Sequence, residues 1–298
     1  MARFLSYAKL NLHLEVLGRR ADGFHELRTL FQSIDLHDDV EIELASGAAI
    51  ELAVAGADLP SDARNLAYRA AAAFRERWGG GGVRIAIKKR IPLGSGLGGG
   101  SSNAATVLLG LCRLRGLRPP LEELAAMAGR LGADVPFFLH GGTALATGRG
   151  DRIARLPDPR LDVPLGVALP SLEVSTAAVF AAHAVASARP RFEIPRPASR
   201  GGVPVSVADL IGWNELQATC FRLHPGLVDV YNALSVSGAR VVRLSGSGAA
   251  LFAVFATAAD AAQAGSGLPP GVRWLPVRAL GREEWLRQGG FDDLAGGD

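Results

Sequence analysis

The residues best suited to chemistry lie in one glycine-rich stretch, Ile91-Pro-Leu-Gly-Ser-Gly-Leu-Gly-Gly-Gly-Ser-Ser-Asn-Ala-Ala105. Glycine lets bare backbone N–H groups approach a ligand, and a helix start adds unpaired N–H donors and about half a positive charge. A strand is expected before this stretch and a helix after it, so the arrangement predicts a phosphate-binding site. A flexible turn with a serine N-cap is the plainer interpretation, but five glycines in seven positions favour anion binding.

Charged and hydroxyl side chains flank these glycines. Lys88, Lys89 and Arg90 precede the loop and are expected to add positive field. Ser101 and Ser102 offer hydroxyls to a phosphate or to a magnesium ion.

Two familiar nucleotide motifs fit the loop poorly. Gly94, Gly96 and Gly99 match G-x-G-x-x-G, yet a dinucleotide site requires a strand after the helix with an acid for the ribose. Here a second helix is expected instead, entered through Pro119-Pro120. A Walker A loop requires Gly-Lys-Ser/Thr, and no Lys follows these glycines. A dinucleotide-dependent oxidoreductase therefore stays only as an alternative.

The composition is that of a globular protein and argues against several classes. Hydrophobic residues make up 48% and charged residues 20%, which rules out wholesale disorder. A net charge of +3 and 6% aromatic residues argue against the remaining non-enzymatic alternative, an RNA-binding module. The two cysteines, Cys112 and Cys220, form no CxxC, so neither a zinc cage nor a disulfide framework is expected. With no signal-like start and no long apolar run, we expect a soluble cytoplasmic protein.

Hydrophobic periodicity predicts the elements that carry these residues. Strands are expected at residues 3–17, 40–44, 50–54, 83–89, 143–147, 151–156, 165–169, 241–244, 251–255 and 273–277. Helices are expected at residues 65–78, 101–115, 121–131, 175–186, 214–221 and 227–234. The proline-rich stretch 157–164 is the best domain boundary, and stretch 190–204, rich in Pro, Arg and Ser, is expected to be a surface loop. The mixture predicts an α+β fold.

Three segments, in the same order, resemble the GHMP kinase superfamily. The first is Lys9-Leu-Asn11-Leu followed by Arg19-Arg20-Ala-Asp22-Gly23-Phe24-His25, the second is the glycine loop, and the third is Leu244-Ser245-Gly246-Ser247-Gly248. In the loop the matching residues are Pro92, Gly96, Leu97, Gly98, Gly99, Gly100, Ser101, Ser102, Ala104 and Ala105. The loop alone indicates the superfamily, whereas the Arg-Ala-Asp-Gly-aromatic-His segment is specific to one member.

The resemblance implies a two-domain α+β GHMP kinase fold. The expected domains are residues 1–157, an ATP-binding kinase domain like ribosomal protein S5 domain 2, and residues 158–298, a ferredoxin-like substrate domain. It implies ATP-dependent phosphorylation, with Mg²⁺, of the 2-hydroxyl of a cytidine diphosphate-linked methylerythritol in the non-mevalonate isoprenoid pathway. A kinase of the homoserine or mevalonate type is the alternative, although neither of those substrates carries a base. We expect a small-molecule substrate, no nucleic acid, no membrane, and a monomer or weak homodimer.

Matching positions imply roles for individual residues. Asp134, which follows a helix, would orient the substrate hydroxyl and take its proton late, and Lys9 would lie beside it; a turn Asp and a surface Lys are the plainer interpretations. No protein metal ligand is assigned. Substrate contacts are implied for Asn11, Phe24, His25, Thr176, Phe180, Ser245 and Gly246, and nucleotide contacts for Asn65, Pro92, Gly94, Ser95, Gly96, Leu97, Gly98, Gly99, Gly100, Ser101 and Ser102.

Several of these residues also have an ordinary structural interpretation. Phe24 and Phe180 would stack on the two faces of a cytosine and His25 would hydrogen-bond to its edge, yet Phe180 equally fits the apolar stripe of its helix. Asn65 would read adenine, yet it also suits a helix N-cap. Phe24 stands where the family often has Tyr, which removes a phenolic hydrogen bond. Ser95 stands where Gly is frequent, which is tolerable if its φ is negative.

Overall fold

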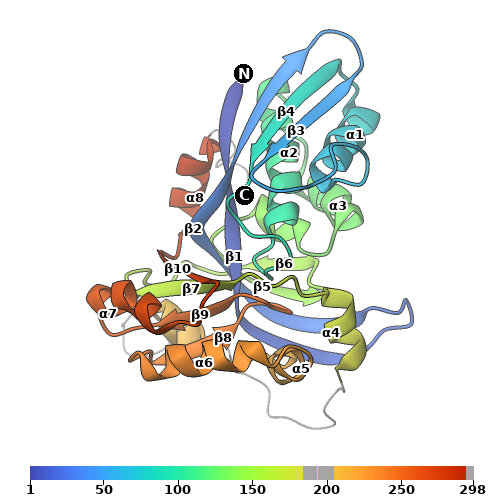
Figure 1. Cartoon of the computed structure of the whole chain (residues 1–298). Helices are drawn as coiled ribbons and strands as arrows, with labels where there is room; N and C mark the ends of the chain where they lie inside the picture. Colours follow the sequence, from blue (N-terminus) through green and yellow to red (C-terminus); the bar gives the residue numbers. More distant parts are fainter. Residues whose placement is uncertain (184–192, 194–204, 293–298) are drawn as a thin grey trace.

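The computed structural model of the chain describes residues 1–183, 193 and 205–292. Figure 1 shows two parts, one above the other, each built on a β-sheet with helices against it. In these described ranges no helix has the length and the apolar character needed to span a membrane. The expected surface loop 190–204 lies outside the described residues, apart from Glu193.

The upper part is built on a six-stranded sheet. Strands β1 (Ala2–Arg19) and β2 (His25–Ala45) form a long antiparallel hairpin. The other side of β2 pairs antiparallel with β4 (Gly82–Lys88) near one end and with β5 (Thr143–Gly148) near the other. At the edges, β3 (Ile50–Ala55) pairs parallel with β4, and β6 (Arg152–Arg155) pairs antiparallel with β5.

Strand β2 is much longer than its hydrophobic pattern indicates. Periodicity predicts only residues 40–44, whereas the strand begins at His25. Its middle, residues 35–39, carries three aspartates and one histidine, which interrupt the alternation of polar and apolar residues. The register with β1 shifts at this point, between Tyr7 and Ala8, and pairing continues on either side of the shift.

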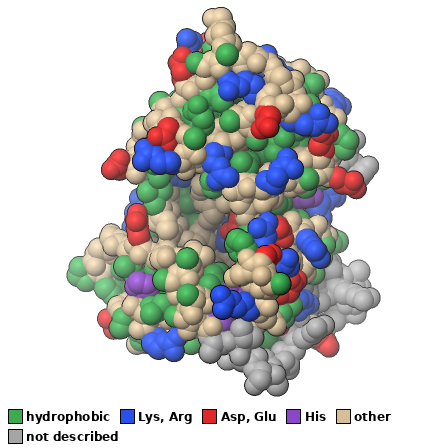
Figure 2. All heavy atoms as spheres, turned by 90° about the vertical axis from the view of Figure 1, so that its right-hand side faces the viewer, with side chains coloured by type: hydrophobic (Ala, Val, Ile, Leu, Met, Phe, Trp, Pro, Cys, Tyr) green, Lys and Arg blue, Asp and Glu red, His purple; other side chains and the backbone are tan. Residues whose placement is uncertain are grey.

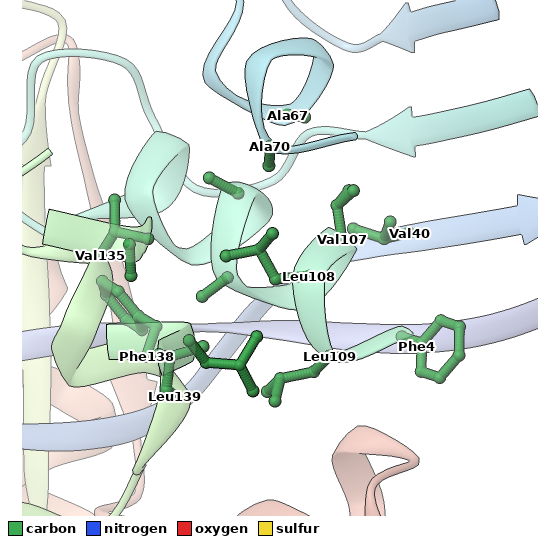
Figure 3. Close-up of a cluster of buried hydrophobic side chains, with 14 of the residues drawn as sticks. Phe4, Val40, Ala67, Ala70, Val107, Leu108, Leu109, Val135, Phe138 and Leu139 are labelled. Carbon is green, nitrogen blue, oxygen red and sulfur yellow. The ribbon is translucent and has the colours of Figure 1, made fainter. Parts of the chain in front are cut away.

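Three helices lie against this sheet close to their predicted positions: α1 (Leu66–Trp78), α2 (Gly99–Arg115) and α3 (Leu121–Leu131). Helix α2 is the central one, and all its residues from 102 to 112 are buried. Figure 3 shows its side chains packed among those of β2, of α1 and of a 3-10 turn at Val135–Leu139. A helix that is apolar nearly all round must be buried, and this packing fixes where its N-terminus points.

The lower part has a four-stranded antiparallel sheet. Strands β7 (Leu165–Pro170), β8 (Val241–Leu244), β9 (Leu251–Val254) and β10 (Val272–Val277) lie in the order β10-β7-β9-β8. Helices α4 (Thr176–Ala182), α5 (Leu216–Leu223) and α6 (Gly226–Val236) come between β7 and β8, and α7 (Ala258–Gln263) comes between β9 and β10. This β-α-β-β-α-β succession is the ferredoxin-like one expected from the resemblance.

Helix α7 was not predicted, and neither was the last described helix, α8 (Arg282–Gly289). It returns from the lower part to pack on β1, where the Tyr7 hydroxyl donates to Gln288 Oε1 at 3.2 Å. The Phe291 ring stacks on Phe4 with centroids 5.2 Å apart. The last described residues therefore join the core of the upper part, and the domain boundary at 157/158 stays a prediction.

Candidate active site

A cleft of about 1260 Å³ lies between the upper and the lower part. Its walls come from the glycine loop, from β1 and β2, from the tip that joins these two strands, and from α4. Figure 2 views this side and shows a hollow with Lys and Arg side chains above and below it. The predicted residues that line the cleft are Lys9, Asn11, Phe24, His25, Asn65, Pro92, Gly94, Ser95, Gly96, Gly98, Gly99, Gly100, Ser101, Asp134, Thr176, Phe180 and Gly246.

The glycine loop brings the N-terminus of α2 to this cleft. Gly94, Gly96 and Gly98 have φ of 58°, 76° and 76°, a conformation that favours glycine. Helix α2 begins at Gly99, two residues before its predicted start, and its N-cap is Gly98 with no side-chain cap. The serine N-cap of the plainer interpretation is therefore wrong. The first-turn N–H groups have no partner within the helix, so they are donors for an anion.

The back of the loop is held by the loop that follows β8. The Ala250 N–H donates to the Ser95 carbonyl at 3.0 Å, and the Ser245 hydroxyl donates to the Gly96 carbonyl at 3.2 Å. A Cβ on Gly96 would collide with the carbonyl oxygen of Ser245. No non-glycine residue in the described ranges has a positive φ. The φ of Ser95 is therefore negative, so a serine is tolerated at this position where the family often has glycine.

Two of the basic residues before the loop are neutralised by aspartates. Lys89 is buried, and its ammonium donates to the Asp38 carboxylate and to Asn103 Oδ1, the latter at 3.0 Å. Arg90 pairs with Asp39, and its N–H donates to Asp38 at 2.7 Å. The expectation that Lys89 and Arg90 add a free positive field is therefore wrong. They anchor the strand end that leads into the loop.

Lys9 and Asp134 are brought together at the cleft from β1 and from the start of the 3-10 turn. Lys9 Nζ lies 3.5 Å from Asp134 Oδ2, with the lysine side chain 3% exposed and the aspartate 35% exposed. The plainer interpretation of Lys9 as a surface residue is wrong. Burial lowers the pKa of Lys9, and the nearby Asp134 carboxylate opposes that shift.

Asn11 is engaged on both sides by protein groups. Its Oδ1 accepts from Lys9 Nζ at 2.5 Å, and its Nδ2 donates to the Thr29 hydroxyl at 2.8 Å. All three side chains are buried. The arrangement ties Asn11 to the position of Lys9, and a contact between Asn11 and the substrate stays a prediction.

Aromatic side chains from two distant segments meet at the same cleft. The His25 and Phe180 rings stack with centroids 5.1 Å apart, and the Arg149 guanidinium lies 5.0 Å from the centroid of the Phe24 ring. Burial, followed by the nearby Arg19 charge, lowers the pKa of His25, which keeps the imidazole neutral at pH 7. The His25–Phe180 stack offers a flat surface with a hydrogen-bonding imidazole edge, which suits a planar heterocycle.

Three predicted residues do not line the cleft. Leu97 and Ser245 are completely buried, and Ser102 is nearly so, its hydroxyl accepting from Ser6 at 2.8 Å. Asn65 lines the cleft, but its side chain caps α1 through Ala67 N and donates to the Pro60 carbonyl.

The cleft residues that sequence reasoning missed include Arg149 and Thr29. Arg149 stands between two positive-φ glycines in the β5–β6 turn, which is the signal that could have found it. Thr29 has no such signal.

Two family models match the chain: the GHMP kinases N terminal domain over residues 65–142 and the GHMP kinases C terminal domain over residues 197–269. The 4-diphosphocytidyl-2-C-methyl-D-erythritol kinase of Moorella thermoacetica is 40% identical over 260 residues, which cover 84% of this chain and 89% of the relative. The chain belongs to this family of GHMP kinases. The kinase of the same name from Syntrophotalea carbinolica is 39% identical, and the match covers 92% of this chain and 96% of that relative.

Solved structures agree with this family. A crystal structure of 4-(cytidine 5'-diphospho)-2C-methyl-D-erythritol kinase superposes with a TM-score of 0.76 at 39% identity and covers 94% of this chain and all of its own. A homoserine kinase from Cytophaga hutchinsonii gives 0.71 at 19% identity, with 95% of both chains covered, which shows the fold alone. The two-domain GHMP kinase fold predicted from the sequence is confirmed. As a kinase of this family the chain is a transferase that uses ATP and phosphorylates an alcohol on a small molecule.

Proposed function

We propose that this chain transfers the terminal phosphoryl group of ATP to the 2-hydroxyl of 4-diphosphocytidyl-2-C-methyl-D-erythritol, a step toward isoprenoid precursors. The observation that carries the proposal is the presence, in one cleft, of an uncapped helix N-terminus, the Lys9–Asp134 pair and the His25–Phe180 stack. The first suits a triphosphate, the second an alcohol and the third a nucleobase.

The nucleotide binds through the backbone of the glycine loop. Amides between Gly94 and Ser101 donate to the phosphate oxygens, and the α2 dipole adds to their attraction. The Asn65 side chain uses one of its two N–H donors and one of its two acceptor sites within the protein, so a contact with adenine would use those that remain. Within the described residues no group of three His, Cys, Asp or Glu side chains can hold a metal ion. An Mg²⁺ ion brought in with ATP would take most of its ligands from phosphate oxygens and water, and the Ser101 hydroxyl, which lines the cleft, could add one. Such an ion would neutralise phosphate charge.

Asp134 accepts the proton of the substrate hydroxyl during the transfer. An alcohol is about as weak an acid as water and a far weaker acid than a carboxylic acid, so complete proton transfer to a carboxylate before the phosphoryl transfer would be strongly unfavourable. Asp134 therefore orients the hydroxyl first and takes the proton as the new P–O bond forms and the bond to ADP breaks. The Lys9 ammonium stabilises the charge on the transferred group.

The cytidine end of the substrate binds beside the β1–β2 tip and α4. Phe24 and Phe180 stack on the base, and the neutral His25 ring offers one donor and one acceptor to its edge. His25 and Phe180 stack on each other in this structure, so the base enters by separating rings or by covering their outer faces. Thr176, hydrogen-bonded to Ser247 at 2.8 Å, and Gly246 close over the methylerythritol unit.

The proposal is tested by ADP release from wild-type protein with four acceptors: the cytidine diphosphate compound, its base-free analogue, L-homoserine and mevalonate. We expect kcat/KM for the cytidine compound to exceed that for the base-free analogue by at least about fivefold, because stacking contributes about 1–3 kcal/mol per base. Homoserine and mevalonate should support no more ADP release than water. Equal turnover of the base-free analogue, or preference for homoserine or mevalonate, would contradict the proposal.

A further inference from the structure

Behind the Lys9–Asp134 pair lies a short chain of buried hydrogen bonds that crosses from β1 to β2. Lys9 Nζ donates to Asn11 Oδ1 at 2.5 Å, Asn11 Nδ2 donates to Thr29 Oγ1 at 2.8 Å, and the Thr29 hydroxyl donates to the His13 carbonyl at 2.6 Å. Lys9 and Asn11 are 3% exposed and Thr29 is 1% exposed, so water does not replace these partners.

Counting donors and acceptors leaves one orientation for the Asn11 amide. The Thr29 hydroxyl has a single proton, which goes to the His13 carbonyl, so toward Asn11 it can only accept. Asn11 must then turn its NH₂ group to Thr29 and its carbonyl oxygen to Lys9. The ammonium has donors only and requires that oxygen, so both ends of the chain demand the same arrangement.

The reverse orientation would damage the catalytic pair. The Asn11 NH₂ would face the Lys9 ammonium, and two donors would oppose each other in a buried site. Besides the Phe31 ring, whose centroid is 5.1 Å from Nζ, Lys9 would keep only the Asp134 carboxylate, now 3.5 Å away, as a side-chain partner in the described residues, and it would be drawn toward that carboxylate. The carboxylate oxygen that must receive the substrate hydroxyl would then be occupied by the lysine.

We propose that Thr29 is a positioning residue for the phosphoryl transfer: its hydroxyl sets the orientation of the Asn11 amide, which in turn holds the Lys9 ammonium in place. The kinetic consequence rests on the proposed function, whereas the orientation of Asn11 does not. Thr29 touches neither the reacting atoms nor the phosphates in this account, and it acts only through Asn11.

The test compares Thr29→Val, which removes the hydroxyl at similar volume, with Thr29→Ser, which keeps it. Thr143→Val is the matched control, because Thr143 is equally buried on the neighbouring strand β5 and donates to Gln32 Oε1 at 2.7 Å, away from Lys9. We expect Thr29→Val to lower kcat about 10- to 100-fold, the size of effect that a displacement of about 1 Å produces, with KM for ATP and for the cytidine compound little changed. Thr29→Ser should restore most of kcat, and Thr143→Val should stay close to wild type, with melting curves showing every variant folded at the assay temperature.

A second measurement does not depend on the substrate. In protein with ¹⁵N-labelled asparagine, the Nδ2 signal of Asn11 is the one lost in Asn11→Ser. Its protons should exchange slowly with solvent in wild type and Thr29→Ser, and at least about tenfold faster in Thr29→Val, because exchange requires the hydrogen bond to open.

The possible outcomes separate the two proposals. Wild-type kcat in Thr29→Val, a kcat in Thr29→Ser as low as in Thr29→Val, or unchanged Nδ2 exchange in Thr29→Val would overturn the role of Thr29. A wild-type protein that does not turn over the cytidine compound would instead defeat the proposed function, and the exchange rates would still decide whether Thr29 orients Asn11.

Discussion

The Lys9 ammonium lies 3.5 Å from the Asp134 carboxylate, and only the carboxylate is substantially open to the cleft. This separation is that of an ion pair rather than a short hydrogen bond, so the carboxylate keeps accepting capacity for another donor. Burial lowers the pKa of Lys9, and the pairing with Asp134 counteracts the loss of its proton. The pair thus places a buried amino group beside a proton acceptor that faces the substrate.

Replacing Asp134 with Asn should remove the proton acceptor with little change in shape. We expect kcat to fall about 10²- to 10⁴-fold, the usual contribution of a general base, while the affinity for ATP measured by calorimetry stays nearly constant. Asp162→Asn, at an exposed position outside the cleft, is the matched control and should keep wild-type kcat. Undiminished turnover in Asp134→Asn would remove this residue from the mechanism.

Gly100→Ala tests whether a ligand approaches the backbone of the loop. A Cβ on Gly100 would meet only Leu66 Cδ1, at 3.8 Å, so the folded protein has room for it. The control is Gly226→Ala at the start of α6, where the new Cβ would meet nothing within 4 Å. Both changes should stabilise their helices by up to about 1 kcal/mol. Only Gly100→Ala should raise the KM for ATP, by about tenfold or more. An unchanged KM would place the triphosphate elsewhere.

Phe180→Ala tests the base-binding end. Loss of one stacking partner should raise the KM for the cytidine compound about 5- to 100-fold, from the 1–3 kcal/mol of a base–aromatic contact, without changing the KM for ATP. Phe221→Ala is the control. The Phe221 ring, on α5, packs against Tyr231 on α6 and does not line the cleft. Equal effects of the two changes would mean that Phe180 serves only the packing of its helix.

Asp38 should be required for stability because it neutralises the buried Lys89. Asp38→Ala leaves that ammonium unpaired, and the free energy of unfolding should fall by about 3–5 kcal/mol in urea titrations. The added change Lys89→Met should recover part of this loss, because it removes the unpaired charge. Asp62→Asn, which breaks an exposed pair with Arg64, should have little effect. A small loss of unfolding free energy in Asp38→Ala would show that the folded protein does not need Asp38 to neutralise Lys89.

His140 should make stability depend on pH below neutrality. Burial, followed by the charges of Arg282 and Arg155, lowers its pKa from 6.5 to about 4. Between these values the unfolded chain binds a proton that the folded chain does not, so the unfolding free energy is full above pH 6.5 and declines as the pH falls toward 4. The decline amounts to about 3 kcal/mol at most, at about 1.36 kcal/mol per pH unit. In His140→Gln that part of the pH dependence should disappear; parallel curves for the two proteins would contradict this assignment.

Local patterns predicted the loop and its helix well, because the signals for them are local. The glycines and the apolar run of α2 specify a strand–loop–helix unit without knowledge of the rest of the fold. The same reasoning missed the first half of β2, where the charges of residues 35–39 are satisfied by Lys89 and by arginines that are distant in sequence. A periodicity argument counts those charges as exposed.

The resemblance to GHMP kinases predicted the residues proposed to react better than it predicted the residues packed around them. It named Lys9 and Asp134, which the fold brings together from distant segments. It could not indicate that Ser102 turns into the core or that Ser245 lies behind the loop, since these depend on which face of a helix or loop is buried. Thr29 was missed because its role in the proposal depends on Asn11, a hydrogen-bond partner on the neighbouring strand.

The central claim is that amides of the glycine loop hold a triphosphate whose end faces Asp134 while the cytidine lies against Phe180. A crystal structure of the protein with a non-hydrolysable ATP analogue and the cytidine diphosphate substrate tests it most directly. We expect the terminal phosphate at the N-terminus of α2, with the acceptor hydroxyl within hydrogen-bonding distance of Asp134. Phosphates bound away from residues 94–101, or a cytosine remote from Phe180, would contradict it.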